Sequence, residues 1–384
     1  MLDHTRIIRG VLLAATAVAM LVLPGAASAA GSHGGAVVFS RVVTKTEKVD
    51  VKDAEGKPVE DAEGKVVQEE KTTVEGGLYA VKDGKLNQLT EDPSDTEPAF
   101  SPDGRAIAYV REGDLFSVRA DGSGLRRLTS GTTLDTAPLI APNGKYVVFE
   151  RRTAIGAPSD LYSVSTLGGS AKQLTNSTDD EHEASFSPDG KAVIYVRSVA
   201  ETGGTADDLY SMRPTGARQA RLTRTARIDE FDPRYFAGGI VYSRGESSPG
   251  PSAYADVYTA KRNGRKVKAQ IAGAGSAYVE DVTADGHTVL FRRDQGLWVK
   301  RIGAGKARKI SELPDGSETN AVFSSDGKKV AAFTDVDGRT QLSSIDVASG
   351  DDRELAEGFE PEEPSSSSGQ VSTIGPVITW QPVR

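Results

Sequence analysis

The stretch AFSPDGRAIAYVREGDLFSV, residues 99–118, is repeated later in the chain with few changes. The second copy, ASFSPDGKAVIYVRS, covers residues 184–198 and is followed by DDLYSM at residues 207–212. Its centre is a Ser-Pro-Asp-Gly tetrad between two apolar runs, which is typical of a tight hairpin turn. Proline presets the first turn residue, aspartate hydrogen-bonds its own backbone, and glycine accepts a positive φ angle. We therefore predict a β-hairpin unit that has been copied along the chain.

The same tetrad recurs at a regular step along the chain. The copies are SPDG at Ser101, APNG at Ala141, SPDG at Ser187, TADG at Thr283 and SSDG at Ser324, with a weaker FAGG at Phe236. The step of about 40 to 50 residues is typical of the four-stranded blades of a β-propeller. Helical periodicity is absent from these copies, so the pattern predicts an all-β fold.

Each copy contains four β-rich segments in the same order. A short strand enters the turn, an apolar strand such as AIAYVR (106–111) leaves it, a third strand such as DLYSV (160–164) follows, and a fourth ends in Leu-Thr. Neither face of the second strand is polar, which predicts a sheet buried on both sides. Sheets stacked face to face around an axis satisfy this requirement.

The two ends of the chain complete the count of blades. Seven third-strand segments occur, but only six copies are uninterrupted. The segment AVVFSR (36–41) matches a second strand and PVITWQPV (376–383) matches a first strand. We therefore predict a propeller of seven four-stranded antiparallel blades, closed by the pairing of the C-terminal strand with the N-terminal strands so that no sheet edge stays open. A six-bladed ring with a loose tail is the alternative.

The N-terminus has the order of a secretory signal peptide. Arg6 and Arg9 precede an apolar run from Val11 to Leu23, and the small residues Ala27-Ser28-Ala29 follow. Residues 1–29 are therefore expected to be removed, leaving a propeller domain at 30–384 in the extracellular, periplasmic or cell-envelope space. No further transmembrane segment is expected. The chain contains no cysteine, which excludes a lipoprotein anchor, disulfides and zinc thiolate sites.

The charge balance argues against nucleic acid as a general partner. The full chain has 46 basic and 54 acidic residues, and the loss of Arg6, Arg9 and Asp3 leaves 44 and 53, a formal net charge of −9. A nucleic-acid-binding domain is usually basic.

The SPDG hairpins, the Asp-Leu-Tyr third strands and the Leu-Thr ends resemble the repeats of the TolB-like β-propeller family, a PD-type WD40-like repeat. They are also similar to the propellers of prolyl oligopeptidases and dipeptidyl peptidases. The resemblance covers about Ala36 to Arg384 and concerns the propeller alone, without the N-terminal domain of TolB or the hydrolase domain of the peptidases. The resemblance implies the propeller fold. Oligogalacturonate lyases, which use a similar propeller, have a histidine-rich metal site, and this sequence departs from that pattern.

Charged residues recur in one register around the predicted ring. Acids precede the first strands at Asp95, Asp135, Glu181, Glu230 and Glu318, and arginines end the second strands at Arg41, Arg111, Arg151, Arg197, Arg244 and Arg293. If Ser101 pairs with Arg105, the antiparallel register sets Asp95 opposite Arg111, and the same count sets Asp135 opposite Arg151 and Glu181 opposite Arg197. One interpretation is an in-blade ion pair repeated around the ring. The other is that the ring mouth offers alternating charge to a ligand.

The mismatched members of these rows are the better candidates for binding a ligand. Counting in the same register places Glu318 opposite Thr334, Arg293 opposite Ala277 and Arg41 opposite Gly375. Asp95, Asp135, Glu181 and Glu230 complete the candidate binding set.

The sequence offers no recognisable catalytic or metal site. No nucleophile elbow or phosphate loop occurs. His182 and His287 are expected on opposite faces of the ring, so they cannot share a metal. No cofactor is expected; calcium at Asp335-Val336-Asp337-Gly338 or at Asp179-Asp180-Glu181 is the weaker alternative.

Loop lengths favour recognition at one face. Connections between third and fourth strands are short, whereas those between second and third strands vary, as in TAIGAPS after Arg152 and GESSPGPSAYA after Arg244. The first of these, residues 44–75, contains DAEGK twice, at Asp53 and Asp61, and predicts a charged hairpin arm. Residues 359–373, rich in proline, glutamate and serine, predict a flexible spacer before the closing strand.

These features predict a monomeric, non-catalytic scaffold that binds a protein, peptide or surface polymer through its long-loop face. The alternative is an enzyme acting on a carbohydrate or peptide, with carboxylates such as Asp180, Glu181 or Glu230 in the central channel.

Overall fold

The computed structural model describes residues 35–201, 204–225, 228–246, 254–273, 276–313, 320–336, 339–355 and 369–380. Every regular element in these ranges is a β-strand. Within the same ranges, the chain has no helix of the length and apolarity that a membrane crossing requires. The predicted signal peptide, residues 1–29, lies outside the described residues.

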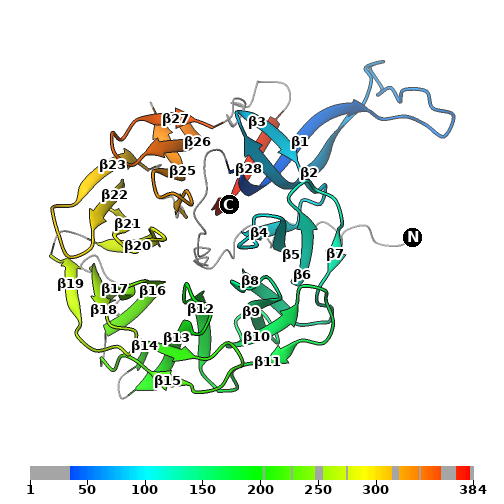
Figure 1. The fold of residues 1–384 in the computed structure, drawn as a ribbon. Helices are drawn as coiled ribbons and strands as arrows, with labels where there is room; N and C mark the ends of the chain where they lie inside the picture. Colours follow the sequence, from blue (N-terminus) through cyan, green and yellow to red (C-terminus); the bar gives the residue numbers. More distant parts are fainter. Residues whose placement is uncertain are drawn as a thin grey trace.

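Seven four-stranded antiparallel sheets form a closed ring, which confirms the predicted seven-bladed propeller (Figure 1). Blade 1 contains β28 (Gly369–Trp380), β1 (Val37–Asp50), β2 (Gln68–Lys82) and β3 (Lys85–Gln88). Blade 2 contains β4 (Asp95–Phe100), β5 (Ala106–Arg111), β6 (Asp114–Arg119) and β7 (Arg126–Arg127). Blade 3 contains β8 (Leu134–Ile140), β9 (Tyr146–Arg152), β10 (Ser159–Ser165) and β11 (Lys172–Gln173).

The other four blades repeat this order. Blade 4 contains β12 (Asp180–Phe186), β13 (Val193–Glu201), β14 (Gly204–Met212) and β15 (Ala220–Arg221). Blade 5 contains β16 (Ile228–Phe236), β17 (Gly239–Glu246), β18 (Ala255–Ala260) and β19 (Lys268–Ile271). Blade 6 contains β20 (Ala277–Val282), β21 (Thr288–Arg293), β22 (Gly296–Arg301) and β23 (Arg308–Glu312). Blade 7 contains β24 (Val322–Phe323), β25 (Lys329–Val336), β26 (Arg339–Asp346) and β27 (Asp352–Glu354).

The C-terminal strand closes the ring, as predicted. β28 is the innermost strand of blade 1 and pairs antiparallel with β1, from Val37 opposite Trp380 to Thr46 opposite Gly369. Both edges of β1 are therefore paired, because β2 lies on its other side. Of the predicted spacer 359–373, residues 359–368 lie outside the described residues, and Gly369 to Thr373 belong to β28.

Two short polar motifs recur in several blades. In the SPDG turn, the Ser101 hydroxyl donates to Asp103 Oδ1 at 2.6 Å, and Gly104 adopts a φ of 67°. The Ser101 amide donates to the Ala106 carbonyl at 2.7 Å, so the assumed pairing of Ser101 with Arg105 was wrong by one residue. In the Leu-Thr motif, the Thr129 hydroxyl accepts the Leu115 amide at 2.8 Å and ties the fourth strand to the third.

The hydrophobic core is divided into seven clusters, each lying between two neighbouring blades. One cluster joins Leu139, Val148 and Leu161 of blade 3 to Phe186 and Tyr195 of blade 4. The other six clusters repeat this arrangement around the ring. Burying one aromatic or aliphatic side chain of this size contributes about 1.5 to 3 kcal/mol. A single blade therefore cannot bury its apolar faces until both neighbours are in place.

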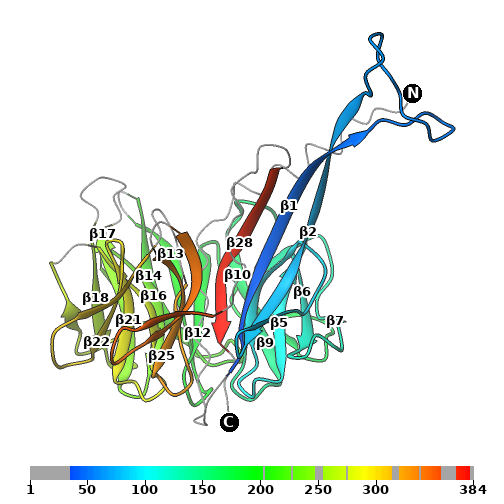
Figure 2. The same ribbon diagram turned by 90° about the horizontal axis from the view of Figure 1, so that it is seen from above.

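The ring has two different faces (Figure 2). We call the face from which β1 and β2 project the arm face; it carries the connections between second and third strands. The opposite face, the turn face, carries the SPDG-type turns and the hairpins between third and fourth strands.

Candidate functional site

The predicted row of acid and arginine pairs lies where the innermost strands begin, at the arm face. The strand register places Asp95 opposite Arg111 and Asp135 opposite Arg151. It also places Glu181 opposite Arg197 and Glu230 opposite Arg244. The first three pairings were predicted from the sequence, whereas Glu230 and Arg244 were predicted only as members of the two rows.

The two aspartates make bidentate ion pairs. The Arg151 guanidinium donates from Nε to Asp135 Oδ1 at 2.6 Å and from Nη2 to Asp135 Oδ2 at 2.7 Å. Arg111 holds Asp95 in the same way, at 2.6 and 2.8 Å. Parallel fork-to-carboxylate bonds of this kind are the strongest charge-assisted geometry. Both carboxylates are completely buried, so their oxygen atoms are occupied inside the blade.

Each arginine of the row also lies over an aromatic ring of the same blade. The Arg151 guanidinium carbon is 4.9 Å from the centroid of the Tyr162 ring and 5.2 Å from that of Phe149. Arg197 lies 5.3 Å from Tyr210, and Arg244 lies 5.3 Å from Tyr258. Cation–π contacts therefore fix the arginine on one side while the carboxylate fixes it on the other.

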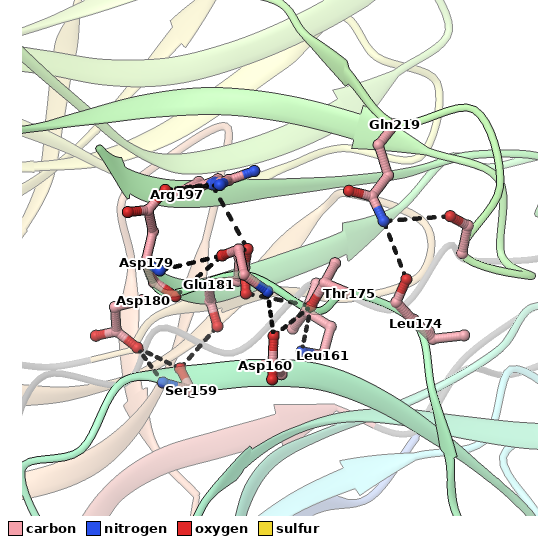
Figure 3. A network of polar contacts seen from close by, with 12 residues as sticks. Ser159, Asp160, Leu161, Leu174, Thr175, Asp179, Asp180, Glu181, Arg197 and Gln219 are labelled. Atoms are coloured by element: carbon pink, nitrogen blue, oxygen red, sulfur yellow. Dashed lines mark hydrogen bonds and ion pairs between the residues drawn. The ribbon is translucent and has the colours of Figure 1, made fainter. Parts of the chain in front are cut away.

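The two glutamates of the row are held more loosely, and Figure 3 shows the surroundings of Glu181. Arg197 directs Nη2 to Asp179 Oδ2 at 2.7 Å, and its Nε lies 3.6 Å from Glu181 Oε1. Hydroxyl groups satisfy Glu181 instead, with Ser177 donating to Oε1 and Thr175 donating to Oε2 at 3.2 Å. Burial raises the pKa of Glu181 to about 7, and Asp160 adds to this effect.

Glu230 repeats this arrangement in blade 5. Arg244 Nε lies 3.5 Å from Glu230 Oε1, and the Thr225 hydroxyl donates to the same oxygen. Burial raises the pKa of Glu230 to about 7. Asp95, Asp135, Glu181 and Glu230 are each at most 1% exposed, so the geometry favours the in-blade ion pair over a charged ring mouth open to a ligand.

The predicted mismatched residues have different surroundings. Arg293 lies opposite Ala277, as predicted, and its guanidinium carbon is 3.7 Å from the Trp298 ring centroid. Arg41 pairs with Ile374 and not with Gly375, because a bulge between Phe39 and Arg41 shifts the register. Glu318 lies outside the described residues; Thr334 pairs with Gln341 on its other side.

A second row of carboxylates lies two residues deeper along the innermost strands, and the sequence interpretation missed it. At a bulge in each strand, residues such as Glu97 and Glu183 adopt φ angles of 52° and 54°. Glu97 Oε2 accepts the backbone amide of Ala137 in the next blade at 2.6 Å, and Glu183 Oε2 accepts that of Asp232 at 2.7 Å. The signal was available in the acid-x-acid spacing of Asp95 and Glu97.

We name the acids that make such bonds between blades the carboxylate row, which comprises Glu97, Glu183, Glu280 and Asp281 of the innermost strands and Glu150 of the second strand β9. Glu150 accepts the Glu183 amide at 2.9 Å, Glu280 accepts the Ala321 amide at 3.1 Å, and Asp281 accepts the Phe323 amide at 2.9 Å. Each bond crosses from one blade to the next. Burial raises the pKa of Glu97 and of Glu280 to about 7, and that of Asp281 to about 6.

His182 lies beside the carboxylate row. Its Nδ1 is 3.6 Å from Glu183 Oε1. Burial disfavours the charged imidazole, but the hydrogen bond and charge of Glu183, together with Glu150 and Asp207, raise the pKa of His182 to about 9. His182 is thus a cation among acids, whereas His287 lies in a turn on the opposite face.

No group of three or more potential metal-ligating side chains converges within the described ranges. For the two calcium alternatives, Asp337 and Gly338 lie outside those ranges, and Asp179 and Asp180 are bonded to Arg197 and Ser159.

The predicted hairpin arm is the largest feature of the arm face (Figure 2). β1 and β2 pair continuously from Val37 opposite Val81 to Asp50 opposite Gln68. Opposite charges face each other along the arm, as in Glu47 with Lys71. Two glycines fix its base. A Cβ at Gly76 would lie 2.5 Å from the Arg41 carbonyl oxygen, and one at Gly77 would lie 2.1 Å from the Thr90 carbonyl oxygen.

The tip of the arm consists of two equivalent turns. Asp53 Oδ1 accepts the amides of Glu55 and Lys57 at 3.0 and 2.9 Å. Asp61 repeats these bonds with residues 63 and 65 at the same distances. Three valines join the turns to the stem in a cycle of amide-to-carbonyl bonds of 2.8 to 2.9 Å, from Val51 to Val67, from Val67 to Val59 and from Val59 to Val51. The eight-residue repeat therefore builds a defined two-lobed tip.

Comparisons with known proteins agree with this architecture. Residues 65–237 match the family model described as PD40, the TolB beta propeller domain. The chain is similar to an oligogalacturonate lyase in complex with manganese, with 13% identity and a TM-score of 0.59 over 72% of this chain and 85% of that chain. It is similar to TolB from Acinetobacter baumannii, with 15% identity and a TM-score of 0.51 over 89% and 83% of the two chains.

A puromycin hydrolase gives a TM-score of 0.61 at 12% identity, over 76% of this chain and 51% of that chain. At these identities the similarity shows the fold, which carries both catalytic and non-catalytic functions.

Proposed function

We propose that the chain is an exported, non-catalytic binding scaffold of the TolB-like β-propeller family, whose propeller model matches residues 65–237. A protein, a peptide or a surface polymer binds at the arm face, and the arm is the main contact. The protein acts outside the cytoplasm as a monomer. The signal-like N-terminus and the position of TolB among similar folds support this assignment.

The arm is the observation that carries the proposal. Its strands have 14 and 15 residues, whereas the four strands of blade 2 have at most six. Beyond the ring its side chains are largely exposed, so it buries little apolar surface to offset the entropy cost of ordering. An isolated two-stranded hairpin is marginal in water. An ordered, charged hairpin on a rigid scaffold is a common arrangement for recognition.

The test compares three forms of the protein in pull-downs from the exported fraction of the producing cells. One form is intact, and the second lacks residues 47–71, with Asn-Gly joining Thr46 to Thr72. The third lacks only the tip, residues 51–67, with Asn-Gly joining Asp50 to Gln68. Both junctions join residues that already pair across the arm, and the first leaves the pairing of β28 with β1 intact.

We expect at least one partner to be recovered with the intact form and lost with the armless form, while the thermal unfolding midpoint changes little. Recovery with the tipless form would place the contact on the stem. If all three forms recover the same set of partners, the arm is not the binding element and the proposal fails.

An enzyme remains the second candidate because of one observation. Glu181 and Glu230 are buried carboxyl groups with pKa values raised to about 7, as general acids often are. An enzyme of this kind would keep its turnover without the arm and lose it when Asp180→Asn, Glu181→Gln or Glu230→Gln is introduced. A binding scaffold would instead lose its partner without the arm and keep it when these acids are substituted.

A further inference from the structure

Positive charge is concentrated in one sector of the turn face, although the chain has a formal net charge of −8. The sector consists of the hairpins between the third and fourth strands of blades 4, 5 and 6, at residues 213–221, 261–270 and 300–309. These hairpins contain 13 lysines and arginines and no aspartate or glutamate. The corresponding hairpin of blade 7, residues 346–354, contains four acids and one arginine. We call the three hairpins the basic sector.

Most charges of the basic sector are not neutralised by the protein. Arg262 is paired with Asp189 at 3.1 Å, Lys309 is paired with Glu312 at 2.5 Å, and Arg221 is paired with Asp208. In the described part of the chain, Lys261, Arg265 and Lys266 are exposed and make no ion pair within 4.0 Å. Unpaired cations of one sign on neighbouring hairpins repel each other, so their accumulation costs stability unless an anion binds them.

Two cations of the basic sector, Arg218 and Lys266, occupy a hairpin position at which blade 2 has Gly124. The hairpins of blades 2 and 5 close with the same bond, from Arg119 N to Ser123 O and from Lys261 N to Arg265 O, each at 2.8 Å. The next residue is left-handed in both hairpins, Gly124 with a φ of 73° and Lys266 with a φ of 59°. In blade 4, Arg218 has a φ of 60° at this position. A side chain is unfavourable in this conformation, so the sequence places charge there against the backbone preference.

Exposed apolar side chains project from the same class of hairpin. Val267 is 46% exposed and lies between Lys266 and Lys268, in a hairpin that contains five lysines and arginines. Leu167, on the adjacent hairpin of blade 3, is 74% exposed, and Leu125 of blade 2 is 56% exposed. The turn face thus combines unpaired cations with apolar tips.

We propose that the basic sector docks on an anionic lipid bilayer. The lysines and arginines contact the headgroups, and Val267 enters the interfacial layer. Basic residues with interspersed apolar side chains are typical of peripheral membrane contacts. A nucleic acid fits less well, because these hairpins contain no aromatic residue on which bases could stack and because an exposed valine gains little beside a phosphate backbone.

This docking leaves the arm available. The basic sector lies across the ring from blade 1 (Figure 1), and the arm rises from the opposite face of the ring (Figure 2). A bilayer bound to the sector therefore does not cover the arm, and the protein can hold a partner while attached to a membrane surface.

The test measures co-sedimentation of the full chain with vesicles of pure phosphatidylcholine and with vesicles that contain 30% phosphatidylglycerol. One variant carries Lys261→Ser, Arg265→Ser, Lys266→Gly and Lys268→Ser. A matched control removes four lysines from the arm, as Lys52→Ser, Lys57→Ser, Lys65→Ser and Lys71→Ser. Both variants change the net charge equally and share the same N-terminus, and thermal unfolding reports that each is folded.

We expect binding to the anionic vesicles alone, weakened about 600-fold in the basic-sector variant and little changed in the arm control, since each of the four lysines and arginines near an anionic surface contributes about fivefold. Raising NaCl from 0.1 to 0.5 M should weaken binding strongly. Val267→Ser should weaken vesicle binding several-fold without changing binding to polyphosphate.

Two results would overturn the proposal. Equal losses in both four-residue variants would mean that net charge and not the basic sector drives binding. Tighter binding to a 30-base-pair DNA duplex than to the anionic vesicles, with the same sensitivity to the basic-sector variant, would assign the sector to a nucleic acid.

Discussion

The contact between the buried acid and its arginine differs between blades 2 and 3 and blades 4 and 5. In each of these blades, an acid near the start of the innermost strand lies opposite an arginine on the next strand. In blades 2 and 3 the acid is an aspartate, and the arginine holds both carboxylate oxygens at 2.6 to 2.8 Å. In blades 4 and 5 the acid is a glutamate, whose distance from the arginine Nε is 3.6 or 3.5 Å.

One methylene group accounts for the difference. The longer glutamate carries its carboxylate past the guanidinium fork toward the connection that precedes the strand. There, hydroxyl groups of Ser177 in blade 4 and Thr225 in blade 5 bind it. A hydroxyl compensates a buried negative charge less well than a guanidinium does, and burial raises the pKa of both glutamates to about 7. Blades 4 and 5 therefore hold acids that can take up a proton near neutral pH.

The largest expected effect comes from removing the acid in each type of blade. Asp135→Ala leaves Arg151 without its buried partner and should lower the free energy of unfolding by about 3 kcal/mol. Glu230→Ala should cost only about 1 kcal/mol, because its arginine is already loosely held. Urea unfolding at pH 7 measures the free energy of unfolding of both alanine variants. Arg151→Met and the double variant Asp135→Ala/Arg151→Met complete a double-mutant cycle for the pair in blade 3. Equal losses in the two blades would contradict the comparison.

The next effect depends on pH. Because folding raises the pKa of Glu230 from 4.5 to about 7, the folded protein binds more protons than the unfolded chain between these values. The stability that this group contributes is complete below about pH 4.5 and is lost as the pH rises through 7. Glu230→Gln mimics the protonated form and should match the wild type at pH 4.5.

At pH 8 the same variant should be more stable than the wild type, by up to about 3 kcal/mol. Urea unfolding at both pH values checks this. A variant that is less stable than the wild type at pH 8 would show that Glu230 is stabilised as the anion.

A smaller effect is expected from converting one type of blade into the other. Glu230→Asp shortens the side chain and should allow Arg244 to form the bidentate pair seen in blades 2 and 3. The loss of the Thr225 bond offsets the gain, so the stability at pH 7 should change by less than about 1 kcal/mol. The informative readout is the slope of stability between pH 5 and pH 8, which should become flatter. An unchanged slope would mean that side-chain length does not set the pKa.

The sequence was sufficient for the fold because each blade repeats the same turn chemistry. It also placed Asp95 opposite Arg111, but through two errors that cancelled. The turn pairs Ser101 with Ala106 and not with Arg105, and the bulge at Glu97 shifts the register back by one residue. In blade 1 a different bulge precedes Arg41, and counting residues from the turn predicted the wrong partner for it, Gly375 in place of Ile374.

The bulges also explain why the carboxylate row was missed. A bulge aims Glu97 and Glu183 at the amides of neighbouring blades, and such contacts depend on how blades pack and not on spacing within one blade. Four acids of the predicted row, Asp95, Asp135, Glu181 and Glu230, lie opposite arginines in the structure, but their burial follows from the stacking of whole sheets. A one-dimensional pattern does not contain that information.

The smallest effect concerns the rings beneath the arginines. Tyr162→Leu keeps an apolar side chain but removes the ring 4.9 Å from the Arg151 guanidinium, so it should cost about 0.5 to 1 kcal/mol. Tyr258→Leu beneath Arg244, at 5.3 Å, should cost no more than this. In an Arg151→Met background, Tyr162→Leu should become nearly neutral, because no cation remains above the ring. If its cost persists there, the ring acts through packing alone, and the bidentate pair of blade 3 depends on the carboxylate without help from the aromatic side chain.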